Sequence, residues 1–139
     1  MNPRLQQTLY YESPAGRLYY HTAGYVRLAW GPARLLLPTI EAYYEQVLAL
    51  LRSTGCRRIL SEHGQRAPLS VEAQAWLTTN WIPRAMSLAH TRHCAIVEGA
   101  NPLHRLSTQS IVSSAPAGFL FKRFDNVSAA ETWLLGVAA

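Results

Sequence analysis

The chain has 139 residues, of which 49% are hydrophobic and 15% are charged, which favours one folded domain over a disordered chain. No apolar run approaches the roughly 18 residues that a membrane-spanning helix needs, and residues 1–14 lack the apolar stretch of a secretory signal. The two cysteines, Cys56 and Cys94, have neither disulfide-framework nor zinc-finger spacing. We therefore expect a cytoplasmic protein with a single domain over residues 1–139.

The formal net charge is +5, so a nucleic-acid partner has to be considered. The cations are twelve arginines and Lys122, and they are scattered along the chain, with Arg57-Arg58 and Lys122-Arg123 the densest pairs. No predicted helix has a basic face, and no basic segment alternates with glycine and aromatic residues. We therefore expect no specific nucleic-acid partner.

Three short strands are predicted in the first third of the chain, over residues 8–12, 17–22 and 25–30. The turn-forming residues 13–16 separate the first two, and Ala23-Gly24 joins the second and third as an antiparallel hairpin. Val26, Leu28 and Trp30 alternate with less apolar residues, as in a strand that packs on one face.

Helices and strands then alternate. Apolar residues at helical spacing predict a first helix that opens near Pro38, with Thr39 as its N-cap, and stops at Gly55. A buried strand over residues 56–61 and a loop over 62–69 come next. The second helix is expected to begin at Ser70 as N-cap, to carry Trp76 and Trp81, and to be kinked at Pro83.

The last third repeats this order. A buried strand is predicted over residues 93–97, and a helix opens at Asn101-Pro102 with Leu103, Leu106 and Ile111 as its apolar residues. A strand over residues 119–124 precedes a final helix capped by Asn126. The fold class is α/β: a mixed, mostly parallel sheet with an N-terminal antiparallel hairpin and about four helices.

Several segments in this order resemble one family, the STAS/SpoIIAA-like superfamily of anti-sigma-factor antagonists. They are residues 16–20 (GRLYY), 26–31 (VRLAWG), the 43–51 helix, 69–76, 81–85 (WIPRA), 95–97 and 124–134. The likeness covers about residues 8–135 and is strongest to small stand-alone bacterial STAS/SEC14-like proteins of undefined function. The resemblance implies a superhelix of β-α units with a mixed sheet, and it does not imply an activity.

In that family a regulatory Ser or Thr follows an Asp at the helix after the central strand. Residues 60–64 (LSEHG) lack this pair, and the nearest capping hydroxyl is Ser70, which we interpret as an N-cap.

Catalytic and metal motifs are missing from the sequence. His90, His93 and Cys94 form the run HTRHC, but His93 and Cys94 should point to opposite faces of a strand, which hinders a shared metal ion. There is no nucleophile elbow and no phosphate loop. We expect no catalytic residue, no cofactor and no metal. An enzyme could use Glu62 and His63 only if the two side chains converge in a cleft.

Two hypotheses remain open. The first is a protein-interaction module with an unidentified partner, with a homodimer as one form. The alternative is a binder of a lipid or other apolar small molecule between sheet and helices, which requires a cavity of ligand size. The candidate partner or ligand residues are Tyr19, Tyr20, Glu62, His63, Arg66, Ser70 and Trp81. The first two come from a tyrosine-rich first third, where one tyrosine of each adjacent pair should face outward.

Overall fold

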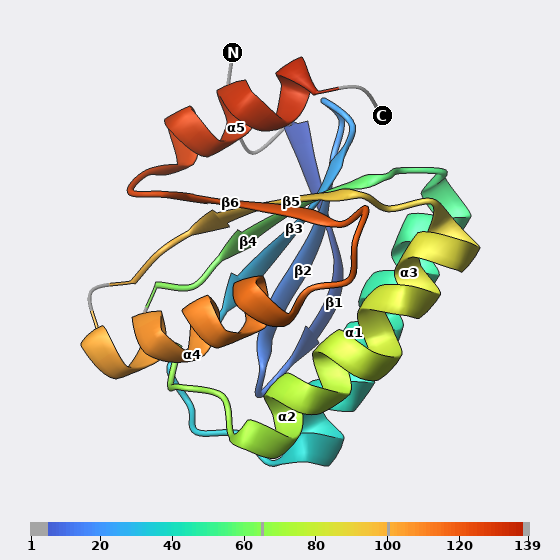
Figure 1. Cartoon of the computed structure of the whole chain (residues 1–139). Coiled ribbons are helices and arrows are strands. Elements are labelled where there is room, and N and C mark those ends of the chain that lie inside the picture. Colours follow the sequence, from blue (N-terminus) through green and yellow to red (C-terminus); the bar gives the residue numbers. More distant parts are fainter. Residues whose placement is uncertain (1–5, 65, 100, 138–139) are drawn as a thin grey trace.

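Six strands form one sheet whose spatial order follows the chain (Figure 1). The computed structural model describes residues 6–64, 66–99 and 101–137. The strands are β1 (Gln7–Ser13), β2 (Gly16–His21), β3 (Tyr25–Trp30), β4 (Arg58–Glu62), β5 (His93–Val97) and β6 (Leu120–Phe124). β1, β2 and β3 pair antiparallel, and β3 to β6 run parallel. The predicted mixed sheet with its N-terminal hairpin is therefore confirmed.

The helices divide between the two faces of the sheet. They are α1 (Leu37–Thr54), α2 (Val71–Trp76), the π-helical turn η2 (Leu77–Trp81), α3 (Ile82–Ala89), α4 (Pro102–Ser114) and α5 (Val127–Gly136). Figure 1 shows α1 to α4 on one face and α5 across the other, over β4, β5 and β6. Each crossover between parallel strands thus returns on the same side, which makes a superhelix of β-α units. When α2, η2 and α3 are counted as one kinked helix, the described residues form four helices, in agreement with the prediction of an α/β fold with about four helices.

Most predicted helix ends agree with the structure. Ser70 and Asn126 accept hydrogen bonds from first-turn N–H groups, and Gly55 ends α1 in the left-handed conformation with φ 71°. The prediction of Thr39 as an N-cap is wrong. The helix already begins at Leu37 because Pro38 fits its first turn, and the Thr39 N–H donates to the Leu36 carbonyl at 3.1 Å.

An aromatic cluster joins α1 to the kinked helix. Trp76 and Trp81 lie five residues apart, and both pack against Tyr44, with ring centroids 6.1 and 4.8 Å away. The π-helical turn makes this possible because its hydrogen bonds span five residues. Trp81 is only 2% exposed, and its Nε1–H donates to the Tyr44 carbonyl at 2.7 Å. Trp81 was predicted as a candidate partner or ligand residue; its burial rules out a place on an outer partner surface, and it lies in the interior.

Candidate functional site: a polar interior beneath α4

Helix α4 lies with its polar side inward. Leu103 and Leu106 are 66% and 67% exposed, whereas His104, Ser107 and Thr108 are buried together with Ile111. Of the three apolar residues named for the predicted helix, Leu103, Leu106 and Ile111, only Ile111 is buried. The buried residues 104, 108 and 111 follow the i, i+4, i+7 spacing of one helical face. That face meets His63 from the loop after β4, which lets hydroxyl and imidazole groups be buried with partners.

The polar interior begins at the carboxyl end of β4. Ser61 accepts a hydrogen bond from Trp30 Nε1 at 2.9 Å, and the next residue on that face, His63, lies beneath α4. His63 Nδ1 is 2.8 Å from His104 Nε2, and Thr108 Oγ1 lies 3.5 and 3.4 Å from these two nitrogens. His63 from the loop after β4 and two residues of α4, His104 and Thr108, are thus held in one hydrogen-bonded group.

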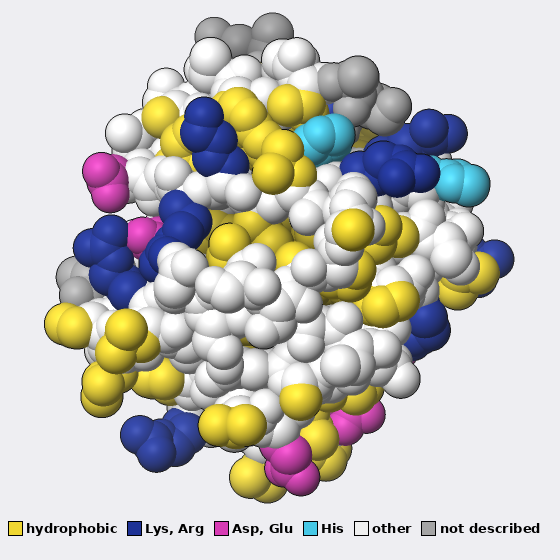
Figure 2. Space-filling view, viewed as in Figure 1, with side chains coloured by type: hydrophobic (Ala, Val, Ile, Leu, Met, Phe, Trp, Pro, Cys, Tyr) yellow, Lys and Arg dark blue, Asp and Glu magenta, His cyan; other side chains and the backbone are white. Residues whose placement is uncertain are grey.

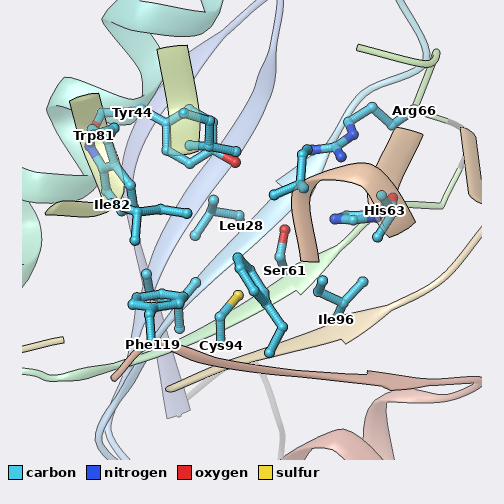
Figure 3. A pocket seen from close by; sticks show the side chains of 15 residues that line it. Leu28, Tyr44, Ser61, His63, Arg66, Trp81, Ile82, Cys94, Ile96 and Phe119 are labelled. Carbon is cyan, nitrogen blue, oxygen red and sulfur yellow. Dashed lines mark hydrogen bonds between the residues drawn. The ribbon is translucent and has the colours of Figure 1, made fainter. Parts of the chain in front are cut away.

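Arg66 places a guanidinium in this interior (Figure 3). Arg66 is 3% exposed, and its guanidinium carbon lies 4.5 Å from the Trp30 ring centroid in a cation–π contact. No carboxylate of the described residues forms an ion pair with it, and its Nε has no hydrogen-bond partner among them. Burial lowers the pKa of the Arg66 guanidinium, and the Tyr44 side chain acts against this effect. Among the described residues, Arg66 is therefore a buried cation without a neutralising carboxylate.

A small cavity lies among these groups. Figure 3 shows Tyr44, Ser61, His63 and Arg66 directed toward a common space whose other walls are apolar. The cavity measures about 30 Å³. That volume holds about two or three water-sized groups. An apolar ligand of several hundred daltons would need a far larger space.

Burial determines the protonation of the titratable side chains around the cavity. Burial lowers the pKa of His63 well below its usual value, and the Arg66 charge adds to the effect. The same two causes, in the same order, lower the pKa of His104 to about 4. Burial raises the pKa of Cys94 to about 12. Both imidazoles are therefore neutral at neutral pH, and Arg66 is the cation of the cavity wall.

Two loops at the carboxyl end of the sheet fix His63. The His63 N–H donates to the Val97 carbonyl at 2.9 Å. A Cβ on Gly99 would lie 2.0 Å from the carbonyl oxygen of Gly64, so only a glycine allows the loop after β5 to approach the loop after β4 this closely. This backbone contact holds the base of the site.

The predicted site residues divide among three places. His63, Arg66 and Trp81 line the cavity, whereas Ser70 is exposed and caps α2. Glu62 faces the opposite side of the sheet, where both of its carboxylate oxygens accept from Arg27, at 2.9 and 2.6 Å. The required convergence of Glu62 with His63 is therefore not found.

The two predicted tyrosines also lie away from the cavity. The Arg27 guanidinium carbon lies 5.2 Å from the Tyr19 ring centroid, on the face of the sheet that carries Glu62. Tyr20 is half-buried against the core. His104 and Thr108 were not predicted as site residues; their spacing on one face of α4 was the available signal.

The outer side of α4 borders a groove that also runs along the kinked helix. One end, a hollow of about 500 Å³, is lined by Arg34, Leu69, Leu103 and Leu106. A second hollow of about 320 Å³ lies between α4 and α2–η2, and it adjoins the first, since Gln74 and Ser110 line both. Figure 2 shows apolar side chains protruding at the start of α4, and others in the depression between α4 and β6.

Comparisons with known proteins leave the chain without an assigned relative: no family model, no curated protein and no solved structure matches it. Membership of the STAS/SpoIIAA-like superfamily therefore stays a prediction.

The described residues contain no group of three or more side chains that could hold a metal ion. Within residues 6–64, 66–99 and 101–137, no helix is both long and apolar enough to cross a membrane.

Proposed function

We propose that this protein is a non-enzymatic binding module that docks a protein partner in the groove along the outer side of α4. The observation that carries the proposal is the orientation of this helix. It exposes Leu103 and Leu106 and buries His104 and Thr108, the reverse of what solvent alone would favour. An apolar outer face beside a groove fits contact with another molecule.

The shape and charge of the groove indicate which kind of partner segment would bind there. A groove between two helices suits an amphipathic segment whose apolar residues enter it in turn. Arg34 at one end is exposed and forms no ion pair with a described residue. The partner segment should therefore carry an acidic residue at that end, which would pair with Arg34 and speed association.

The alternative hypothesis, an apolar ligand held between sheet and helices, has less support. The cavity beneath α4 measures about 30 Å³ and contains a buried cation. A lipid tail would have to enlarge this cavity and pack against the guanidinium. The outer groove offers more space and is already open.

Replacement of both exposed leucines tests the docking proposal. We expect Leu103→Glu/Leu106→Glu to reduce recovery of the partner at least tenfold in a crosslinked co-purification from the native host, because two charges would enter the apolar contact. The variant should unfold at the same urea concentration as the wild type, since both side chains are exposed in the free protein. The measurement is the ratio of wild-type to variant recovery for each copurifying protein.

Leu88→Glu provides the matched control. Leu88 is an exposed leucine on α3, outside the residues that line the groove, so this variant should recover the partner as well as the wild type does. Equal recovery by the wild type and the double variant would contradict docking on α4. Light scattering of the purified protein adds a second readout: a dimer that the double variant abolishes would identify a second copy as the partner.

A further inference from the structure

We propose that the end of the molecule at which β4, β5 and β6 begin is a contact surface for the anionic lipid headgroups of a membrane. The inference does not rest on the proposed function, because the docking hollow lined by Arg34 and Leu69 follows the carboxyl ends of β3 and β4 instead. It depends on arginines that gather without acidic partners, on exposed leucines among them, and on loops without exposed aromatic residues. The residues of this surface, named here the basic end, are Arg52, Arg57, Arg58, Leu88, Arg92 and Leu120.

Two loops bring the arginines together, one between α1 and β4 and the other between α3 and β5. Arg52 and Arg57 line one hollow of about 170 Å³ together with the end of α3. Burial lowers the pKa of His93, and the charges of Arg58 and Arg92 add to the effect, so both guanidinium groups lie near this ring. Figure 2 shows basic and histidine side chains together at the upper right, where α1 and α3 end in Figure 1.

The charge of the basic end is not neutralised by the described residues. None of its four arginines forms an ion pair with them, and Arg58 donates to the Val137 carbonyl at 2.9 Å. Glu131 of α5 reaches the start of β3, where it accepts a hydrogen bond from the Tyr25 hydroxyl. Only Arg52 lies within a helix, so a favourable interaction with a helix dipole does not account for the other three. The chain segments that lead to and from this end contain no aspartate or glutamate: residues 46–61, 73–97 and 99–124.

Exposed leucines lie among these cations. Leu88 is 46% exposed and lines the hollow with Arg52 and Arg57, and Leu120 is 54% exposed. The Leu120 N–H donates to the Arg92 carbonyl at 2.8 Å, so a leucine lies beside an arginine here as well. A headgroup layer accepts both kinds of side chain, because lipid phosphates bind guanidinium groups and the acyl boundary takes up apolar side chains.

The basic end fits a nucleic acid less well. Proteins that bind single strands use aromatic side chains on which the bases stack. Residues 52–58 and 88–93 contain no Phe, Trp or Tyr, and Phe119 next to Leu120 is buried. A duplex would contact the arginines but would leave the exposed leucines without an apolar counterpart. An anionic membrane surface is therefore the partner that matches both the charges and the leucines.

Flotation with lipid vesicles tests the proposal. The full chain is mixed with vesicles of phosphatidylcholine alone, or of phosphatidylcholine with phosphatidylserine. At about 0.1 M salt we expect binding to the anionic vesicles alone, and loss of binding at about 1 M salt, where screening is much stronger. Arg57→Gln/Arg92→Gln should lower the partition coefficient by more than about tenfold, since each arginine at an anionic surface contributes on the order of fivefold.

Arg17→Gln/Arg105→Gln is the matched control for the loss of charge. It removes the same number of positive charges, but Arg17 lies opposite Ala29 near the carboxyl end of β3, and Arg105 pairs with Glu98 just after β5. Because both positions lie away from the basic end, this variant should bind anionic vesicles within about twofold of the wild type.

The contribution of the leucines is measured separately. Leu120→Ser should lower the partition coefficient at least about threefold, because an apolar side chain is lost from the headgroup boundary. Leu9→Ser is the control, since Leu9 is 48% exposed on β1, at the other edge of the sheet, and should keep wild-type binding. Urea unfolding should be the same for both variants and the wild type, because both leucines are exposed.

Four outcomes would overturn the proposal. They are absent or equal binding to the two kinds of vesicle, an equal loss in the two double arginine variants, an unchanged partition coefficient in Leu120→Ser, and binding to a single-stranded oligonucleotide but not to vesicles. No protein partner is present in this experiment, so its failure would leave the docking groove on α4 untouched.

Discussion

Two buried histidines connect distant parts of the chain in the interior of this protein. His63 and His104 meet at 2.8 Å from elements that are 41 residues apart in the sequence. Burial disfavours a positive charge on either ring and the nearby guanidinium adds to this effect, so both rings are neutral at neutral pH. The histidine pair therefore couples the packing of α4 to pH.

The pH dependence of stability follows from this pair. Burial lowers the pKa of both histidines in the folded state, so the unfolded chain takes up protons first as the pH falls below about 6.5. Stability should be complete above that value and decrease toward pH 4, by about 1.4 kcal/mol per pH unit for each histidine. Urea unfolding at pH 8, 7, 6 and 5 measures this slope.

The double variant His63→Asn/His104→Asn tests whether the histidine pair causes this pH dependence of stability. It should retain only the smaller slope of the remaining groups, among them His93, whose pKa burial also lowers. A wild-type stability that is constant from pH 7 to pH 5, or an equal slope in the double variant, would show that the histidine pair is not the cause.

A second residue-scale prediction concerns the contact between Gly99 and Gly64. Gly99→Ala should cost at least about 2 kcal/mol, because the new Cβ would overlap a backbone carbonyl oxygen that a side-chain rotation cannot move. Gly136→Ala is the control, since nothing lies within 4 Å of its Cβ position and the residue ends a helix. Chemical denaturation compares the two variants; equal free energies of unfolding would contradict the close approach.

At the scale of elements, sequence patterns predicted those parts of the fold that depend on local signals. The strands over residues 25–30 and 93–97 have the predicted bounds, because alternation and apolar runs are read directly from neighbouring residues. Ser70 and Asn126 cap their helices as expected, since a cap needs only its own side chain and the next turn.

The orientation of α4 could not be predicted in the same way. Leu103, Leu106 and Ile111 are the apolar residues of the predicted helix, but which face of a helix is buried depends on what lies opposite it. Here the opposite wall carries His63 and Arg66, which reach the interior from a loop and leave no periodic signal in the sequence. The candidate site was therefore found in part: the loop over residues 62–69 was identified, and its partners on α4 were not.

Ser70 offers an element-scale test that separates capping from other roles. Ser70→Ala should lower the free energy of unfolding by about 1 kcal/mol, because the Ala73 N–H loses its acceptor at 3.1 Å. Ser70→Asp should retain wild-type stability, since aspartate caps helices equally well. Thermal or urea unfolding distinguishes these outcomes, and an equal loss in both variants would contradict the capping role.

At the scale of the whole molecule, α4 separates two environments. Its inner side covers a small, largely apolar cavity at the carboxyl end of the parallel strands, where α/β folds commonly place ligand sites. Its outer side carries exposed leucines along a groove shared with the kinked helix. The central claim is that the inverted orientation of α4 serves recognition by a protein partner.

Site-specific photocrosslinking tests this claim most directly. A photoreactive amino acid is placed at position 106 on α4 or, as a control, at position 88 on α3, and the protein is irradiated in its native host. We expect one dominant crosslinked species from position 106, absent from position 88 and lost when Leu103→Glu is added. Crosslinks of equal yield and identity from both positions, or none from position 106, would contradict it.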